Sequence, residues 1–587
     1  MHRIRINSTI AFLLVAVPAA AQDIDPTVEV SRIYQGKMME VHKPMIGMQI
    51  PDSVMHFDLD FDYSVFDNPY KGTYEFNPYV QDMKPQSAAW SGRRLFLRAG
   101  AGYPLHPVFD FVWSPDLKGK FRMSTYVTHR SYIGKYRGIV PVMDESSGTV
   151  CLESPQGMPA GSSWKGYDSQ TSAGVDGRVS WDKGIFTFNV GYYGLATSDT
   201  LVSRGYNAFD AGLRVRSSDR QDRHFLYDVS LDYRYGVDNI DGFAVTRGLS
   251  GHELSFSSVL GPVFSESQRF TVGIDLDMVS YGRAFGTDAG RFAVIPEYQL
   301  SKGRWRLGLG VRLSAMFNGG EAGLLPSQDT KKGQYVYPDI KVSYDIIRDY
   351  MRIYAKLGGG ESIGRYSDML RTGHFIHPLY TLTAGGPLLD NTVERISASL
   401  GLRGNIASRF SYDLSAGYRN FASAPLFAAV SGSRSSIDGL SATLGYTGMQ
   451  MFYASLDYGW NSADFSLDGN FTYRYSDVSA GDVFLSDGNN TWMSFFLPAA
   501  FSGDVRALYN WHRRIYAGAD CRFSTARDGA LCSTAGYADL GIYLELRTAR
   551  LFSFWIRGGN LLNMTVQYMP MYAESGINFT AGICLNL

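Results

Sequence analysis

The sequence predicts an all-β fold, a transmembrane antiparallel barrel of about 22 strands, and three observations support that prediction. Segments of strand length alternate between apolar and polar residues along most of the chain. The amino terminus has the pattern of an export signal, and beyond it no apolar run is long enough for a membrane helix. For an exported envelope protein this leaves a soluble fold or a barrel of the outer membrane, and the strand pattern favours the barrel.

The clearest alternation lies between Arg304 and Phe317. Every second residue from Trp305 to Phe317 is apolar, while the residues between them are Arg, Gly or Ser as far as Ser314. Successive side chains of a strand point to opposite faces, so one face requires lipid or a core and the other requires water. A soluble sandwich would have to bury many such apolar faces in a dry core. A closed barrel in lipid needs no dry core and leaves no strand edge unpaired.

Residues 1–21 are expected to be a signal peptide. Arg3 and Arg5 precede an apolar run, and the small residues that end at Ala21 fit a cleavage site before Gln22. No Cys follows that site, which favours a cleaved secretory signal over a lipoprotein anchor.

Composition agrees with a membrane barrel, and the net charge identifies no partner. Aromatic residues make up 14% of the chain, charged residues only 19%, and 63 residues are Gly. Aromatic girdles at the two membrane interfaces and tight turns account for such a composition. The formal net charge of −1 gives no basis for nucleic-acid binding.

Residues 22–91 do not share the strand rhythm and contain several prolines. We expect a periplasmic or lumenal arm here. The acidic residues Asp58, Asp60 and Asp62 alternate along it. They lack the Gly and the bidentate Glu of a calcium-binding loop, so a solvated strand face is the preferred interpretation.

Residues 92–587 are expected to form the barrel, with strands that follow one another to the final residue. Connections alternate between short and long, as in outer-membrane barrels with short periplasmic turns and longer extracellular loops. The predicted short turns are 302–303 and 348–349, and the predicted long loops are 139–167, 318–333, 362–391 and 476–503.

Charged residues at inward-facing positions are the candidates for a solute pathway, although any one of them is equally explained as solvated barrel wall. These lumen-facing candidates are Arg304, Arg306, Arg312, Arg403, Arg409, Arg419, Asp228, Asp232, Asp464 and Asp468.

Candidate chemical sites are weak. Cys521 and Cys532 flank a turn-like segment, so a disulfide between them is one possibility, and the cysteine spacings do not match a zinc site. His374 and His377 lie in a long loop without a carboxylate partner placed by the spacing, which makes them poor metal candidates. The chain has no nucleophile elbow. We therefore expect no cofactor and no enzymatic activity, with a barrel-scaffolded surface hydrolase as the alternative.

Near the carboxyl terminus an Asn560-Leu561-Leu562-Asn563 turn leads to a final strand in which every second residue is apolar. Over about its last 50 residues the chain resembles the end of TonB-dependent receptor barrels. The resemblance implies that this strand closes the barrel and carries a signal for the barrel assembly machinery. Residues 22–91 are too few for the plug domain of that family, so the chain resembles a plugless form as in Bacteroidota. The residues with the closure and assembly role are Ile577, Phe579, Ile583, Leu585 and Leu587.

Together these features predict an outer-membrane barrel that acts in transport or as the barrel subunit of a larger envelope complex. The expected partners are membrane lipid, the barrel assembly machinery, and a surface lipoprotein or a periplasmic protein. Whether TonB is engaged is left open, because we expect this chain to have no plug domain.

Overall fold

A computed structural model describes most of the chain from residue 94 to residue 587. It describes these residues apart from 118, 144–149, 154–162, 200–201, 219–223, 243–246, 284–286, 320–331, 349, 377–388, 407–408, 432–440, 479–482, 485–491, 530–531 and 549–550. The signal peptide predicted for residues 1–21 and the arm predicted for residues 22–91 both lie outside the described residues.

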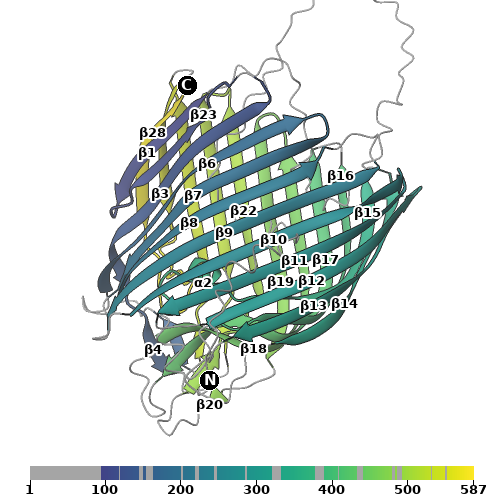
Figure 1. Ribbon diagram of the computed structural model, residues 1–587. Coiled ribbons are helices and arrows are strands. Elements are labelled where there is room, and N and C mark those ends of the chain that lie inside the picture. Colours follow the sequence, from purple (N-terminus) through teal and green to yellow (C-terminus); the bar gives the residue numbers. More distant parts are fainter. Residues whose placement is uncertain are drawn as a thin grey trace, which may run out of the picture. The chain divides into compact units, whose positions relative to one another are not determined.

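The described strands form one closed antiparallel barrel (Figure 1). Its sheet contains 24 strands, of which the short β20 (Val483–Phe484) and β21 (Trp492–Phe495) are additions beside β17 (Phe410–Ser431), so 22 strands close the ring. Each of the 22 pairs with the next in sequence, and β1 pairs with β28. The prediction of an all-β barrel of about 22 strands is therefore confirmed.

Most ring strands have at least the about 9 residues that a tilted membrane-crossing strand requires, whereas β2 (Val108–Trp113) has 6 and β27 (Phe552–Gly559) has 8. The ring comprises β1 Leu95–Tyr103, β2 Val108–Trp113, β3 Phe121–Arg137, β6 Ser163–Trp181, β7 Gly184–Ser198, β8 Val202–Ser217, β9 Phe225–Gly242, β10 Arg247–Ser265, β11 Gln268–Arg283, β12 Thr287–Lys302, β13 Trp305–Gly319, β14 Gly333–Ile347, β15 Met351–Ser362, β16 Thr392–Ile406, β17 Phe410–Ser431, β18 Ser441–Asn461, β19 Phe465–Val478, β22 Phe501–Trp511, β23 Ile515–Ser524, β26 Tyr537–Arg547, β27 Phe552–Gly559 and β28 Asn578–Asn586.

Connections are short at one end of the barrel and mostly longer at the other. We call these the turn end and the loop end. The barrel begins and finishes at the turn end, where Leu95 and Leu587 exchange two backbone hydrogen bonds of 2.9 and 2.8 Å. The connections predicted as long all lie at the loop end, and both predicted short turns lie at the turn end.

Small elements decorate the loop end. A second sheet joins β4 (Val140–Met143), β5 (Val150–Glu153), β25 (Cys532–Thr534) and β24 (Arg527–Asp528). The additional strands of the main sheet are β20 (Val483–Phe484) and β21 (Trp492–Phe495), and the helix α2 is Tyr366–Thr372. No helix in the described part of the chain is long and apolar enough to cross a membrane.

The outward face of the barrel is apolar, as the alternation on β13 illustrates. Leu309, Leu313 and Phe317 are 44%, 46% and 45% exposed although they are large and apolar. Arg312, between them, points inward and its side chain is only 12% exposed. A wet, charged interior inside a lipid-compatible exterior explains this reversal of the usual burial pattern.

The final strand closes the barrel in the predicted phase. Phe579 lies opposite Tyr103, and Ile583 and Leu585 lie opposite residues of β1. Strand β28 begins at Asn578, so Ile577 lies just before it. The assembly role of these residues stays a prediction.

The disulfide considered for Cys521 and Cys532 is not formed, since both thiols are free. Cys521 lies on barrel strand β23, opposite Leu540 of β26, whereas Cys532 lies on the separate four-stranded sheet. The two residues therefore do not face each other across a hairpin, as the turn-like sequence between them had suggested.

Candidate functional site

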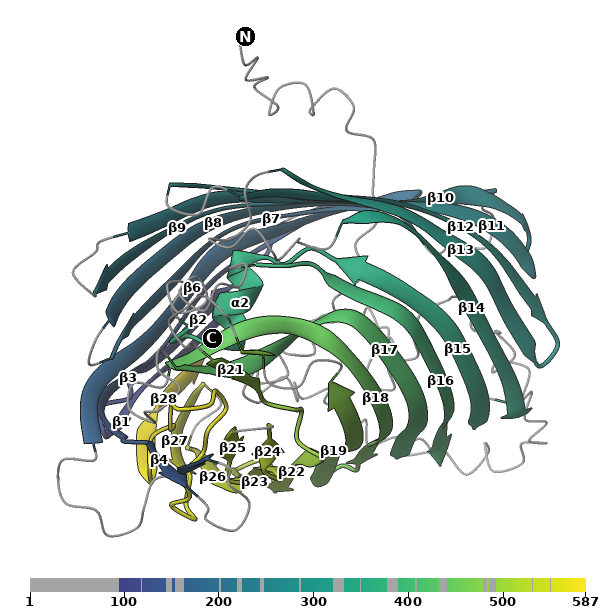
Figure 2. The ribbon, with the colours of Figure 1, turned by 90° about the horizontal axis from the view of Figure 1, so that it is seen from below.

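The loop between β15 and β16 folds into the barrel. We call the first described part of this loop, residues 363–376, the lumenal strap; residues 389–391, just before β16, are also described. Figure 2 shows the helix α2 of this strap inside the ring of strands. The helix has 7 residues, of which Tyr366, Ser367, Met369 and Leu370 are buried. A helix this short is not stable by itself, so contacts with the surrounding wall must hold it in place.

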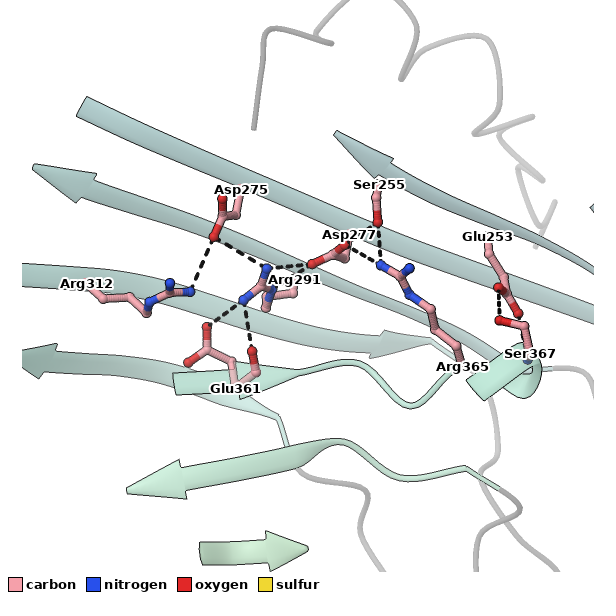
Figure 3. A network of polar contacts seen from close by, with 9 residues as sticks. All are labelled: Glu253, Ser255, Asp275, Asp277, Arg291, Arg312, Glu361, Arg365 and Ser367. Atoms are coloured by element: carbon pink, nitrogen blue, oxygen red, sulfur yellow. Dashed lines mark hydrogen bonds and ion pairs between the residues drawn. The ribbon is translucent and has the colours of Figure 1, made fainter. Parts of the chain in front are cut away.

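Polar side chains of β10 and β11 hold the beginning of α2 (Figure 3). The guanidinium of Arg365 donates to Asp277 Oδ1 at 2.5 Å and to the hydroxyl of Ser255. Ser367 donates twice to Glu253, from Oγ at 2.6 Å and from its backbone N–H at 3.1 Å. Hydrogen bonds that involve a charged group are about twice as strong as neutral ones, so these contacts fix the position of the helix.

A buried ion pair on β8 and β9 holds both ends of the strap. Arg204 Nε lies 3.0 Å from Asp238 Oδ2, with side chains only 3% and 0% exposed. Arg204 also donates to the backbone carbonyls of His374, at 2.9 Å, and Ile376. Asp238 accepts a hydrogen bond from the Tyr366 hydroxyl. One wall pair thus binds the first helical residue and the chain after the helix.

A chain of alternating charges continues from these anchors along the wall (Figure 3). Arg291 lies 2.6 Å from Asp277 and 3.5 Å from Asp275, and it donates to the backbone carbonyl of Glu361 at 2.9 Å. Arg312 lies 3.3 Å from Asp275. Through this network, β11, β12 and β13 all support the carboxylate that holds the start of α2.

The other side of the strap is apolar. Met369, Leu370 and Ile376 belong to one buried cluster together with Leu444 of β18 and Met569. Met569 belongs to the connection between β27 and β28. The strap therefore reaches from the polar anchors on β8–β11 to β18 and to a second connection at the loop end, and it obstructs the lumen between them.

Aromatic rings join the strap to that second connection. Phe375 stacks on Tyr572 with ring centroids 4.7 Å apart, and Trp164 packs edge-on against Phe375 at 5.9 Å. The Tyr572 hydroxyl donates to Asp199 Oδ2 at 3.0 Å. The three rings cover one another, so they are packing contacts and leave no exposed ring face on which a ligand could stack.

His374 joins the strap to β6. Its Nδ1 lies 2.7 Å from Asp168 Oδ2. Burial works against the imidazolium, but the hydrogen bond and the charge of Asp168 more than offset it and raise the pKa of His374. Among the described residues no group of three metal-ligating side chains is found. His377 lies outside those residues.

Most of the predicted lumen-facing candidates lie on the inner wall, in separate ion pairs around the ring. Arg312 alone belongs to the strap network; Asp232 lies on β9 opposite Ser255 and Gly212. The other pairs are Arg306 with Asp345, Arg403 with Asp413, Arg419 with Glu394, Asp228 with Arg214 and Asp468 with Arg506.

Three of the predicted candidates do not lie on the wall. Arg304, Arg409 and Asp464 are exposed residues of the short connections at the turn end. The prediction of a lumen-facing position is corrected for them. Each of the three directly precedes the first residue of a strand. The predicted alternation was therefore extended one residue beyond the strand. Strand boundaries are the least reliable part of a pattern-based prediction.

The sequence analysis missed the residues that hold the strap. Asp238 follows Asp228 and Asp232 in the same alternating phase of β9, so its inward direction was available from the pattern. Arg204, Glu253 and Asp277 were available in the same way from their strands. The alternation could not show which loop enters the lumen, since that depends on contacts between residues far apart in sequence.

The fold and the apolar exterior define a class, the large barrels of the outer membrane. No family model and no curated protein match the sequence. Solved structures do match the fold. A copper transporter, OprC, is 13% identical, with a TM-score of 0.58 over 84% of this chain and 80% of that chain. The ferric-catecholate import receptor Fiu from E. coli K12 is 10% identical, with a TM-score of 0.58 over 84% and 82%.

A third similar structure is the FrpB iron transporter from Neisseria meningitidis, 8% identical with a TM-score of 0.59 over 84% of this chain and 81% of that chain. Identities this low establish a shared barrel fold and nothing finer about function.

Proposed function

We propose that this chain is a transport barrel of the outer membrane in which the lumenal strap is the closing element. In this proposal the turn end faces the periplasm and the loop end faces the outside. The observation that supports it best is the position of the strap, which lies across the lumen and is bound to the wall on both sides. In this proposal the strap moves aside before a solute passes through the part of the lumen that it fills.

The manner of attachment also favours a movable element. The strap is held at its start by side-chain contacts such as Arg365 to Asp277 and Ser367 to Glu253, and no described strand pairs with it. Each hydrogen bond to a charged group contributes about 1.5–3 kcal/mol, so displacing the strap requires a driving force such as a bound solute, but it breaks side-chain contacts only. Displacing the strap therefore leaves the barrel ladder intact.

Similarity in fold gives limited support for the kind of solute. The similar structures are named as transporters of copper and iron and as a ferric-catecholate import receptor. The inner wall of this chain carries paired charges of both signs, which suits a polar solute. The proposal does not depend on whether the barrel engages TonB. The surface-hydrolase alternative has no supporting observation.

A role as subunit of a larger envelope complex is a second candidate. Strand β4 lies at one edge of the four-stranded sheet at the loop end, and Val142 is 40% exposed there. An edge strand offers unpaired backbone groups to another chain. A pull-down from native membranes with wild type and with Val142→Lys would test this, because a surface partner that pairs with β4 should be lost from the variant.

The transport proposal is tested by removing the strap helix. In the test variant a Gly-Ser linker of equal length replaces residues 366–372. Single-channel conductance of the refolded protein in a planar bilayer should rise several-fold over wild type, because the obstruction is gone. The control is the double variant Arg419→Gln with Glu394→Gln, which removes a wall ion pair outside the strap network and should leave conductance unchanged. Equal conductance of wild type and the linker variant would contradict a closing role.

A further inference from the structure

Two lysines face each other on the outside of the barrel, near the loop end. Lys135 of β3 lies directly opposite Lys165 of β6, and both side chains are exposed. Ile133, two residues earlier on the same face of β3, is 48% exposed, which identifies this face as the outward one. Like charges directly opposite on neighbouring strands destabilise a sheet. Neither lysine forms an ion pair with any residue that the structure describes.

The height of this lysine pair matches the surface of the membrane. Phe121 begins β3 at the turn end. With about 3.3 Å of rise per residue and a tilt of about 40°, the strand climbs roughly 35 Å from Phe121 to Lys135. The apolar band of an outer-membrane barrel is about 25 Å tall. With Phe121 taken as the lower edge of that band, the two ammonium groups lie above the acyl chains, at the level of the lipid headgroups.

Exposed apolar side chains lie just before Lys135 along the outer face. Leu105, in the connection between β1 and β2, is 49% exposed. Leu105 forms a β-bridge with Ile133, so these two apolar side chains lie on neighbouring segments just below the lysines. Apolar residues below and cations above are the arrangement that suits an amphipathic ligand with acyl chains and an anionic head.

The positive charge is local to this part of the wall. Outward positions at the loop end of β12 and β19 carry Asp288 and Asp477, and both are exposed. Acidic residues there repel an anionic headgroup. An anionic lipid would therefore be attracted to the sector of β3 and β6 and away from those two sectors.

We propose that Lys135 and Lys165 bind the phosphate of a phosphorylated lipid in the outer leaflet, with the acyl chains against Leu105 and Ile133. A phosphate group between the two ammonium groups removes the repulsion that the bare pair suffers. Two lysines and one phosphate supply attraction without a requirement for a particular sugar or glycerol head. The site is outside the barrel, so it is independent of the strap and of the transport proposal.

The test compares lipid retention by full-length protein in detergent, measured by native mass spectrometry. The test variant is Lys135→Gln with Lys165→Gln. The control is Lys302→Gln with Lys332→Gln, which makes the same change in net charge at exposed lysines elsewhere. The probes are dioleoyl phosphatidic acid, dioleoyl phosphatidylcholine and inorganic phosphate. Heat-modifiable gel migration verifies that each variant is folded.

Wild type and the control variant should retain phosphatidic acid about tenfold better than phosphatidylcholine, and the test variant should lose that preference. Retention of the preference by the test variant would overturn the assignment of the two lysines. Displacement of phosphatidic acid by an equal concentration of inorganic phosphate would overturn the lipid part, and would show that the pair is a site for free phosphate.

Discussion

The charged pair of Arg204 and Asp238 is buried inside the barrel, where each side chain depends on the other as its partner. Arg204 and Asp238 are almost fully removed from solvent, and removal of one partner from such a pair typically costs 3–5 kcal/mol. Apolar replacements of a buried pair are often as stable, so stability alone does not explain the pair. The role of the pair is explained by the hydrogen bonds from Arg204 to the carbonyls of His374 and Ile376, since these bonds determine where the strap lies.

His374 makes the attachment of the strap sensitive to pH. Its pKa is raised from the ordinary value of 6.5, so the protonated form is favoured in the folded chain. The contact with Asp168 contributes fully below about pH 6.5 and is lost as pH rises through the raised pKa. Channel openings in a planar bilayer should therefore become more frequent as the pH rises above about 6.5 and through the raised pKa of His374.

Two variants separate this effect from other titrations. His374→Gln keeps a polar side chain but cannot be charged, so the rise in openings should be lost except for any contribution of Glu574, whose pKa burial raises to about 7. The charge of Glu574 also raises the pKa of His374, whereas Arg204 lowers it. In Glu574→Gln the rise in openings should therefore begin at lower pH. An unchanged pH profile in His374→Gln would exclude His374 as the titrating group.

Neighbouring residues on β13 should differ sharply in what they tolerate. Leu309 faces outward, so Leu309→Arg places a charge in the lipid band at a cost of about 2–4 kcal/mol near the midplane and should block assembly. Arg312→Leu should be far better tolerated, because Asp275 keeps its second partner, Arg291. Heat-modifiable gel migration measures assembly of each variant. Equal tolerance of the two changes would contradict the register of β13.

At the scale of elements, period-two alternation was enough to predict the strands, their inward and outward faces and the alternation of short and long connections. It was not enough to predict the strap. Arg204 contacts His374 across 170 residues of sequence, and no local pattern encodes that distance. The 7 residues of α2 are also too few to show a helical period. Its position is a product of tertiary contacts alone.

The final strand is the element on which closure depends. Strand β28 pairs with β27 on one side and with β1 on the other. Deletion of Phe579–Leu587 would leave two strand edges unpaired in lipid, which the bilayer does not allow. We expect the truncated chain to accumulate in the periplasm or to be degraded, as measured by membrane fractionation and immunoblotting. Normal amounts of it in the outer membrane would refute the role of this strand.

At the scale of the whole molecule, the strap does not settle how the lumen is closed. A ring of 22 strands encloses a wide channel, and the described part of the strap contacts only some of its wall. Residues 22–91, which lie outside the described residues, remain the other predicted element of closure or docking. Their sequence combines apolar residues with the acidic Asp58, Asp60 and Asp62, which suits a basic target.

Removal of residues 22–85 behind an intact signal peptide separates the possible roles of this segment. The barrel should still insert, because all of its strands lie beyond residue 94. If the segment occludes the lumen, conductance should rise, and it should rise further when the strap helix is also replaced by the linker. If it docks a partner instead, a co-purifying protein should disappear from pull-downs while conductance stays constant. If neither quantity changes, the segment has neither role and closure belongs to the strap and the other loops.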